Sequence, residues 1–416
     1  MNTPLITNDA IVLGILMGIL AVVFITSGSD LPFWRKFYTF IPPLLLCYFL
    51  PSVFSTLGIF SGDTSKLYAV ASQYLLPTSL VLLTISIDLK SIARLGPKAV
   101  IMFLGGTVGV IIGGPLAILI MSFINPGLVG GQGPDAVWRG LTTIAGSWIG
   151  GSANQTAMKE VFAVSDHLFS AMIAVDVIVA NVWMACLLFA AGRAERLDAR
   201  IGADASAIDE VKRKVEEYRA KVSKIPALRD TIVVLAVGFG VTALSHLGAD
   251  IIVPKIQQTA PYLEQFSLTS KFFWIVVIAT TGGLLLSTSE RARSLEGVGA
   301  SRLGSAFLYV LIATIGMKMN ILAVFDQPGL FLVGLIWMSI HVTIMLALAI
   351  LIKAPTFFVA VGSQANIGGA ASAPVVASAF HPALAPVGVL LAVLGYALGT
   401  YGGFISGQMM RLVAPQ

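Results

Sequence analysis

The chain has 416 residues, of which 56% are hydrophobic and only 11% are charged, and its mean hydropathy is +0.89. Apolar stretches of about 20 residues, each long enough to cross a bilayer, recur from end to end and exclude a soluble enzyme. The net charge of +5 comes from basic residues in the loops, where they report topology rather than nucleic-acid binding. The sequence therefore predicts a multi-pass, all-α membrane protein.

Two sets of six apolar segments follow one another, separated by a polar stretch. The first set lies at 10–28, 37–57, 68–88, 98–124, 137–163 and 166–191, and the second at 229–248, 271–288, 302–325, 329–353, 356–380 and 384–410. We therefore divide the chain into an N-terminal membrane repeat over 1–192, a polar linker over 193–228 and a C-terminal membrane repeat over 229–416. Apolar residues at helical spacing predict a short amphipathic helix in the linker, at Ile208, Val211, Val215, Tyr218 and Val222.

A short polar phrase occurs twice inside these apolar segments. It extends from Gly146 to Gln155 in the first half and from Gly362 to Gly369 in the second. Glycines, small hydroxyls and carboxamides suit a chain that stops being helical at membrane depth and exposes backbone groups to a solute. A second pair of related segments, Thr84–Leu89 and Thr314–Met319, extends the duplication. Two repeats that each carry a polar break are typical of a transporter.

The positions of the basic residues predict how the broken segments meet the membrane. If all twelve segments crossed, the basic residues over 35–36 and 90–98 would face the side opposite to the linker and to the basic residues over 291–302, against the positive-inside tendency. The conflict disappears if 137–163 and 356–380 are re-entrant hairpins, the first entering from outside and the second from inside. This interpretation gives ten crossings, an external N-terminus and two inverted halves. The alternative, in which both segments cross as interrupted helices, requires one basic cluster to break the charge rule.

The segments from Ser147 to Lys159 and from Ser363 to Thr400, and above all the run from Gly388 to Gly402, resemble the YjcL-like family of bacterial polytopic membrane proteins, a domain of unknown function. The resemblance covers nearly the whole chain. That family is distantly similar to cation/proton antiporters, bile-acid-type sodium symporters and sodium-glutamate symporters, which implies inverted repeats whose discontinuous helices cross near the bilayer midplane. It also implies a multi-pass protein of the bacterial inner membrane. Related transporters are often dimers through their outer helices, which implies a homodimer here, although the sequence leaves the oligomeric state open.

Asp176 lies deep within an apolar segment next to a polar break. A carboxylate at this depth is costly unless it is paired, protonated or bound to a cation. The resemblance to cation/proton antiporters also implies an acidic residue here, on the helix after the first discontinuous segment, although the paired Asn-Asp or Asp-Asp dipeptide of those proteins is missing. We expect an ion or proton site at Asp176, and the alternative is a structural carboxylate bonded to a hairpin.

The carboxamides and hydroxyls of the polar phrases are the other candidates for the binding site. Their oxygens suit sodium, carboxamides can also bind a carboxylate, and half-helix N-termini favour an anionic group. The alternative role is to satisfy backbone groups that are freed where the helices break. The candidate substrate or ion ligands besides Asp176 are Asn154, Gln155, Gln364, Asn366, Ser147, Ser152, Thr156, Ser363 and Ser372. Sodium is expected at Asn154, Asp176 and Asn366.

Charged residues near the segment ends have two interpretations each. Asp88 and Lys318 occupy equivalent positions of the two repeats with opposite charges, so they either pair as a gate or anchor separately in the membrane interface. His341 either shuttles protons or is a neutral, hydrogen-bonded histidine. A cluster of charged and polar residues beside the first broken segment predicts a solvated mouth; its members are Lys159, Glu160, Asp166 and His167.

No sequence motif indicates an enzyme or a cofactor, since phosphate loops, nucleophile elbows and metal-ligand spacings are absent from the sequence. We expect a sodium- or proton-coupled secondary active transporter of a small organic anion or similar metabolite, whose partners are the lipid bilayer and the solute. A passive channel or export pore and a non-transporting membrane sensor or scaffold are the alternatives. Dependence of uptake on an ion gradient distinguishes the first from the other two.

Overall fold

The computed structural model is helical, without strands, over the residues that it describes, and this confirms the all-α prediction. These residues are 4–41, 43–88, 92–93, 95–203, 227–266, 268–319, 328–381 and 384–415. The predicted amphipathic helix with Ile208 and Val222 lies outside the described residues.

Ten helical segments of the described chain correspond to the ten predicted crossings. Seven are long and apolar enough to cross a membrane, two bent pairs raise this number to nine, and α16 is one residue shorter than the 18 needed. The chain is therefore a multi-pass membrane protein. The segments are α1 (Asp9–Ser27), α2 (Pro32–Phe40) with α3 (Pro43–Thr56), α4 (Leu67–Val70) with α5 (Leu76–Ile85), α7 (Pro97–Ile124), α10 (Asp166–Ala191), α13 (Leu228–Thr259), α14 (Lys271–Ser287) with α15 (Glu290–Arg293), α16 (Ala300–Gly316), α18 (Gly329–Ile352) and α21 (Ala385–Val413). Short helices α8 (Pro126–Val129) and α11 (Ala194–Ile201) lie between them.

The predicted segment 137–163 forms hairpin 1, which consists of the two arms of α9 (Val137–Val161). Gly151 interrupts the helix with φ 74° and ψ −173°, a conformation that glycine alone adopts readily. The chain then folds back, so that the backbone N–H of Ser165 donates to the carbonyl of Pro134 at 3.1 Å. Because the two ends of the segment lie together, it is re-entrant, and the crossing alternative is wrong for this segment.

The predicted segment 356–380 forms hairpin 2, which consists of α19 (Thr356–Ile367) and α20 (Gly369–Phe380). Its turn includes Gly369 at φ 58°. The rings of Phe357 and Phe380, near the two ends of the segment, are 5.3 Å apart between centroids. This segment is therefore re-entrant as well.

The two hairpins enter from opposite ends of α7, which has 28 residues and is about 42 Å long at ~1.5 Å per residue. Near the N-terminal end of α7, Lys98 Nζ donates to the carbonyl of Lys353, just before hairpin 2, at 2.9 Å. Beyond the other end, the carbonyl of Gly130 accepts from the N–H of Val137, where hairpin 1 begins, at 3.1 Å. Inverted halves would produce this arrangement, whereas the symmetry of the complete repeats stays a prediction.

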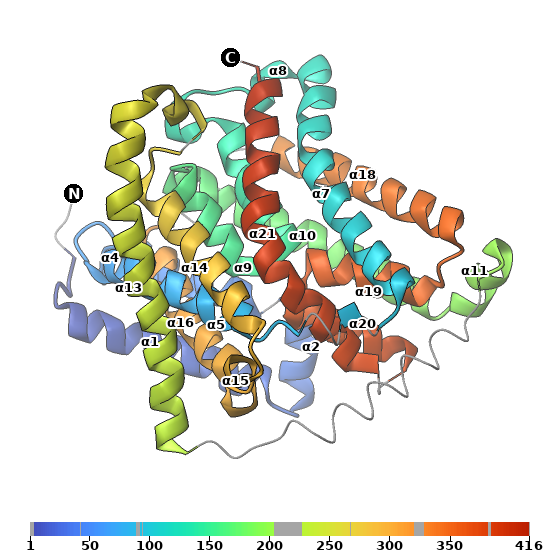
Figure 1. The fold of residues 1–416 in the computed structure, drawn as a ribbon, viewed down its shortest axis with the longest axis horizontal. Coiled ribbons are helices and arrows are strands. Elements are labelled where there is room, and N and C mark those ends of the chain that lie inside the picture. Colours follow the sequence, from blue (N-terminus) through green and yellow to red (C-terminus); the bar gives the residue numbers. More distant parts are fainter. Residues whose placement is uncertain are drawn as a thin grey trace.

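Hairpin 1 packs closely on α21 because glycines of the two elements face each other. A Cβ atom on Gly399 would lie 2.6 Å from Gly150 Cα, and one on Gly403 would lie 3.2 Å from Gly146 Cα. Small residues allow such close approach between helices in a membrane. Figure 1 shows α9 and α21 near the centre, with α13, α14 and α16 on one side and α7, α18 and α19 on the other. We call the two hairpins with α7, α10, α18 and α21 the hairpin bundle, and α1, α3, α4, α5, α13, α14 and α16 the scaffold bundle.

Candidate functional site

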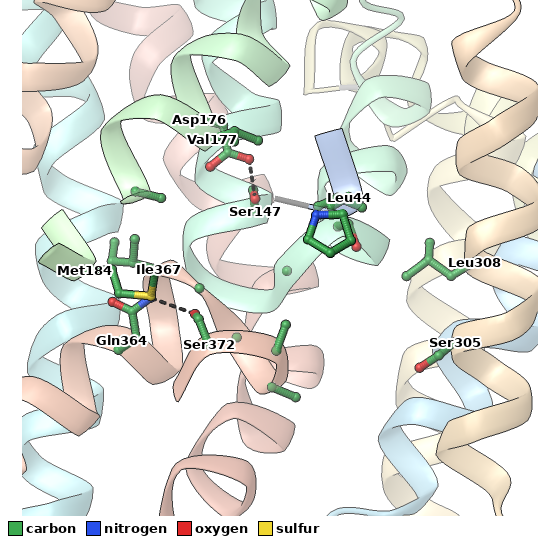
Figure 2. Close-up of a pocket in the computed structure, with 18 of the residues that line it drawn as sticks. Leu44, Ser147, Asp176, Val177, Met184, Ser305, Leu308, Gln364, Ile367 and Ser372 are labelled. Atoms are coloured by element: carbon green, nitrogen blue, oxygen red, sulfur yellow. Dashed lines mark hydrogen bonds between the residues drawn. The ribbon is translucent and has the colours of Figure 1, made fainter. Parts of the chain in front are cut away.

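A cavity of about 430 Å³ lies where the tips of the two hairpins meet. A Cβ atom on Gly369 would lie 4.0 Å from Gly151 Cα, so the two breaks adjoin. The wall is formed by both tips and α10 on one side and by α3 and α16 of the scaffold bundle on the other. Figure 2 shows Asp176 and Gln364 on the hairpin side and Leu308 on α16. The cavity therefore lies at the boundary between the two bundles.

Asp176 ties α10 to hairpin 1 and also lines the cavity. Its Oδ2 accepts hydrogen bonds from Ser147 Oγ at 2.6 Å and Gln155 Nε2 at 2.8 Å, and its Oδ1 accepts one from Trp148 Nε1 at 2.6 Å. The side chain is 5% exposed, and it carries the only formal charge among the described residues on the cavity wall. Asp176 is thus bonded to a hairpin and also reaches the cavity, and its role as an ion or proton site stays a prediction.

Asn154 links hairpin 1 to α21. Its Nδ2 donates to the carbonyls of Gly150 at 3.1 Å and Tyr396 at 2.9 Å, and its Oδ1 accepts from Thr400 Oγ1 at 2.7 Å. Gly150 is the last residue before the tip glycine, so one of these bonds is made at the break of α9.

Asn366 links hairpin 2 to α7 in the same way. Its Nδ2 donates to the carbonyls of Gly362 and Phe103, both at 2.9 Å, and its Oδ1 accepts from Thr107 Oγ1 at 2.8 Å. Both asparagines are fully buried, and neither lines the cavity. Their hydrogen-bonding groups hold the hairpins to neighbouring helices, which matches the alternative role of satisfying backbone groups where the helices break. Of the three predicted sodium ligands, only Asp176 is on the cavity wall.

The remaining candidates divide between the cavity wall and the layer behind it. Gln364 is 1% exposed, its Nε2 donates to Ser372 Oγ at 2.6 Å, and its Oε1 has no hydrogen-bond partner among the described residues. The candidates on the cavity wall are Ser147, Ser152, Gln364 and Ser372. The candidates that do not line the cavity are Gln155, Thr156 and Ser363.

His341 holds hairpin 2 against α18. Its Nε2 lies 2.8 Å from Ser363 Oγ and its Nδ1 lies 3.1 Å from the carbonyl of Gly106. Trp183 Nε1 of α10 donates to the same serine at 2.8 Å. His341 is completely buried and does not line the cavity. The structure therefore shows the hydrogen-bonded histidine of the second interpretation.

A charge cluster joins the base of hairpin 1 and the start of α10 to the scaffold bundle. We define it as Lys159, Glu160, Asp166 and Lys318. Asp166 pairs with Lys159 Nζ at 2.8 Å and with Lys318 Nζ at 3.3 Å. Lys159 Nζ donates to Tyr68 Oη at 2.9 Å, and Tyr68 in turn bonds Glu160. Because Lys159 is only 4% exposed, the prediction of a solvated mouth is wrong for this residue.

Of the two interpretations of Asp88 and Lys318, the gate is wrong. Lys318 Nζ lies 4.7 Å from the ring centroid of Tyr68, at the start of the helical segment Leu67–Ile85. Asp88 follows the other end of that segment, about 28 Å away for 19 residues at ~1.5 Å each. The two residues thus lie toward opposite sides of the protein, and Lys318 pairs with Asp166 instead.

Sequence reasoning missed the threonines and aromatic residues that complete the site. Thr107 and Thr400 bond asparagines more than 200 positions away, and no local pattern indicates such partners. Tyr309 and Tyr396 reach the cavity wall from the scaffold bundle and from α21. Trp148 lies inside the polar phrase. Its indole N–H, a hydrogen-bond donor among glycines, was the one feature of the sequence that could have marked it as a site residue.

Two comparisons place the chain among known proteins. A family model described as "Protein of unknown function (DUF819)" matches residues 14–413. The chain is also 24% identical over 373 residues to "Uncharacterized membrane protein YjcL" of Bacillus subtilis (strain 168), and the alignment covers 86% of each protein.

Proposed function

We propose that this chain, which belongs to the DUF819 family of proteins of unknown function, is a secondary active transporter. It couples the movement of a small organic solute to that of sodium ions or protons. The observation that carries the proposal is that two broken hairpins from opposite ends of α7 meet at a cavity beside the buried Asp176. Broken helices that meet inside a membrane protein expose backbone groups to a solute without exposing them to lipid.

The position of the cavity supports transport by alternating access. Its α10 wall extends from Asp176 to Met184, whereas Asp166 of the charge cluster lies at the start of α10, about 15 Å before Asp176 for ten residues at ~1.5 Å each. The cluster joins the hairpin bundle to the scaffold bundle through Lys318. Displacement of the hairpin bundle along the scaffold bundle, with rupture of this cluster, would expose the hairpin tips to the opposite side.

Asp176 is the coupling residue in this proposal. A carboxylate at membrane depth binds a cation or a proton because either removes the cost of the isolated charge. The three donors from hairpin 1 connect that event to the hairpin tip. The small organic anion suggested by the sequence would bind without a basic side chain, since none is on the described cavity wall. The backbone N–H groups in the N-terminal turn of α20 would then be the main groups that attract the anion.

The proposal is tested with purified protein in lipid vesicles that are incubated in a defined mixture of metabolites. A sodium or proton gradient is imposed inward in one experiment and outward in another, so that both symport and exchange would be detected, and the vesicle contents are measured by mass spectrometry. At least one solute should accumulate above its external concentration, and an ionophore that dissipates the gradient should abolish the accumulation. Equilibration of solutes without a gradient would indicate a channel, and no uptake of any solute would favour a sensor or scaffold.

A further inference from the structure

We infer that the transported solute carries a positively charged nitrogen and exchanges with the coupling cation at Asp176. This inference rests on the proposed transport function and specifies the class of its substrate. It differs from the organic anion suggested by the sequence, because it uses the composition of the cavity wall.

The first argument is the charge of the cavity. Asp176 is the one charged side chain on the described wall, which contains no lysine, arginine or histidine. An anionic solute would bring a second negative charge next to a buried carboxylate, and no basic side chain on the wall would compensate it. A cationic solute would neutralise Asp176, to which the described residues provide three hydrogen-bond donors and no positive charge on the wall.

The second argument is the set of hydrogen-bond acceptors and rings on the wall. Each carboxylate oxygen has two acceptor sites, and Asp176 Oδ1 accepts one bond, from Trp148. Gln364 contributes a buried Oε1 that has no partner among the described residues. The rings of Tyr309 and Tyr396 also line the cavity, and aromatic rings attract organic cations. An ammonium group supplies the donors that these groups lack.

The third argument is size. The cavity of about 430 Å³ is within the range of sites for organic molecules, roughly 300–1,000 Å³, whereas one water molecule occupies about 30 Å³. The described residues also contain no group of three or more histidine, cysteine or acidic side chains that could hold a metal ion. An organic amine therefore matches this cavity better than a metal ion alone.

Exchange follows from the presence of a single carboxylate on the described wall. Asp176 cannot neutralise a cationic solute and a coupling cation at the same time. The two would therefore occupy the site in turn, and binding of one would weaken binding of the other by the same factor.

The test measures binding to the purified full-length protein with three probes of equal chain length: pentylamine, pentanamide and pentanoate. Pentylamine should bind in calorimetry and raise the melting temperature, whereas the neutral amide and the anion should not. Asp176→Asn should weaken pentylamine binding at least about 30-fold, as expected for loss of one partner of a buried charge pair. Asp250→Asn, which makes the same chemical change at an exposed ion pair with Lys271, is the matched control and should leave binding unchanged.

Two variants of Gln364 keep the inference testable if Asp176→Asn does not fold. Gln364→Glu retains an acceptor and adds negative charge, so it should preserve or tighten pentylamine binding, while Gln364→Met should weaken it. The coupling ion identified in the vesicle experiment should compete with pentylamine. Binding of pentanoate in preference to pentylamine, absence of pentylamine binding, or tighter binding in the presence of that ion would overturn the inference.

Failure of this inference is distinguishable from failure of the proposed function. Gradient-driven accumulation of an anion would retain the transporter and reject the cationic solute. Binding of pentylamine without gradient-driven accumulation of any solute would retain the cationic site and reject secondary transport.

Discussion

At the scale of single residues, Asp176 connects the cavity to hairpin 1 through Ser147, Trp148 and Gln155. Asp176→Asn removes the charge and keeps the shape, so the protein should still fold but should no longer accumulate a solute against its gradient. The measurement is ion-driven accumulation in vesicles, with Asp250→Asn as the control for a remote acidic residue. Undiminished gradient-dependent accumulation in Asp176→Asn would exclude this residue from coupling.

Thr107 tests the structural role of the buried asparagines. Thr107→Val removes the hydroxyl that donates to Asn366 Oδ1 and leaves that oxygen unsatisfied, which should cost about 1–3 kcal/mol of stability. Thr107→Ser keeps the hydroxyl and should remain close to the wild type. Thermal unfolding in detergent compares the two variants, and equal melting temperatures for both would contradict the assigned hydrogen bond.

The residues of the cavity could be predicted only in part. The depth of Asp176 in an apolar segment and the polar residues of the repeated phrases and their surroundings identified five members of the wall, which are Asp176, Ser147, Ser152, Gln364 and Ser372. Asn154 and Asn366 looked equivalent in the sequence, but whether a carboxamide faces a cavity or a neighbouring helix depends on distant partners such as Thr400 and Thr107. That tertiary information is not present in a local pattern.

At the scale of elements, the hairpins depend on glycines at their tips and at their contacts. Gly151→Ala would place a side chain at φ 74° and should cost about 1–3 kcal/mol. Gly399→Ala would bring a Cβ atom to 2.6 Å from Gly150 Cα and should destabilise by a similar amount, about 1–3 kcal/mol. Gly14→Ala in α1, where no atom lies within 4 Å of the added Cβ, is the control. Melting temperatures should fall for the first two variants only.

The charge cluster should block access to the cavity from its side of the protein by holding the two bundles together. Lys318→Met removes the ion pair with Asp166 that joins the segment after α16 to the start of α10. We expect faster labelling of a cysteine placed at Ser152, on the cavity wall, from the side of the cluster. Lys271→Met, which removes an exposed ion pair, should leave the labelling rate unchanged. Unchanged labelling in Lys318→Met would show that the cluster does not close the cavity.

The helices themselves could be predicted more completely than the site. Apolar segments define helices such as α10, for which the expected range 166–191 matches Asp166–Ala191. The distribution of basic residues favoured re-entrant hairpins, and the contact between Ser165 and Pro134 shows the first of them. The ion pair between Lys318 and Asp166 could not be predicted, because it joins residues more than 150 positions apart that no local pattern connects.

At the scale of the whole molecule, two hairpins face each other across a cavity at the boundary of two bundles. This arrangement accounts for the duplicated polar phrase, since each half contributes one broken element to a single site. The homodimer implied by the resemblance stays a prediction, as does the assignment of the two ends of α7 to the outside and the inside of the cell.

The central claim is that the hairpins enter the membrane from opposite faces, and cysteine labelling in intact cells tests it most directly. In a variant without Cys47 and Cys186, single cysteines replace Pro134 or Ala163 at the base of hairpin 1 and Lys353 or His381 at the base of hairpin 2; all four positions are exposed. A membrane-impermeant reagent should label both hairpin 1 positions from outside, and it should reach both hairpin 2 positions only after the membrane is opened. Labelling of all four positions from one face, or of the two positions of one hairpin from different faces, would contradict the account.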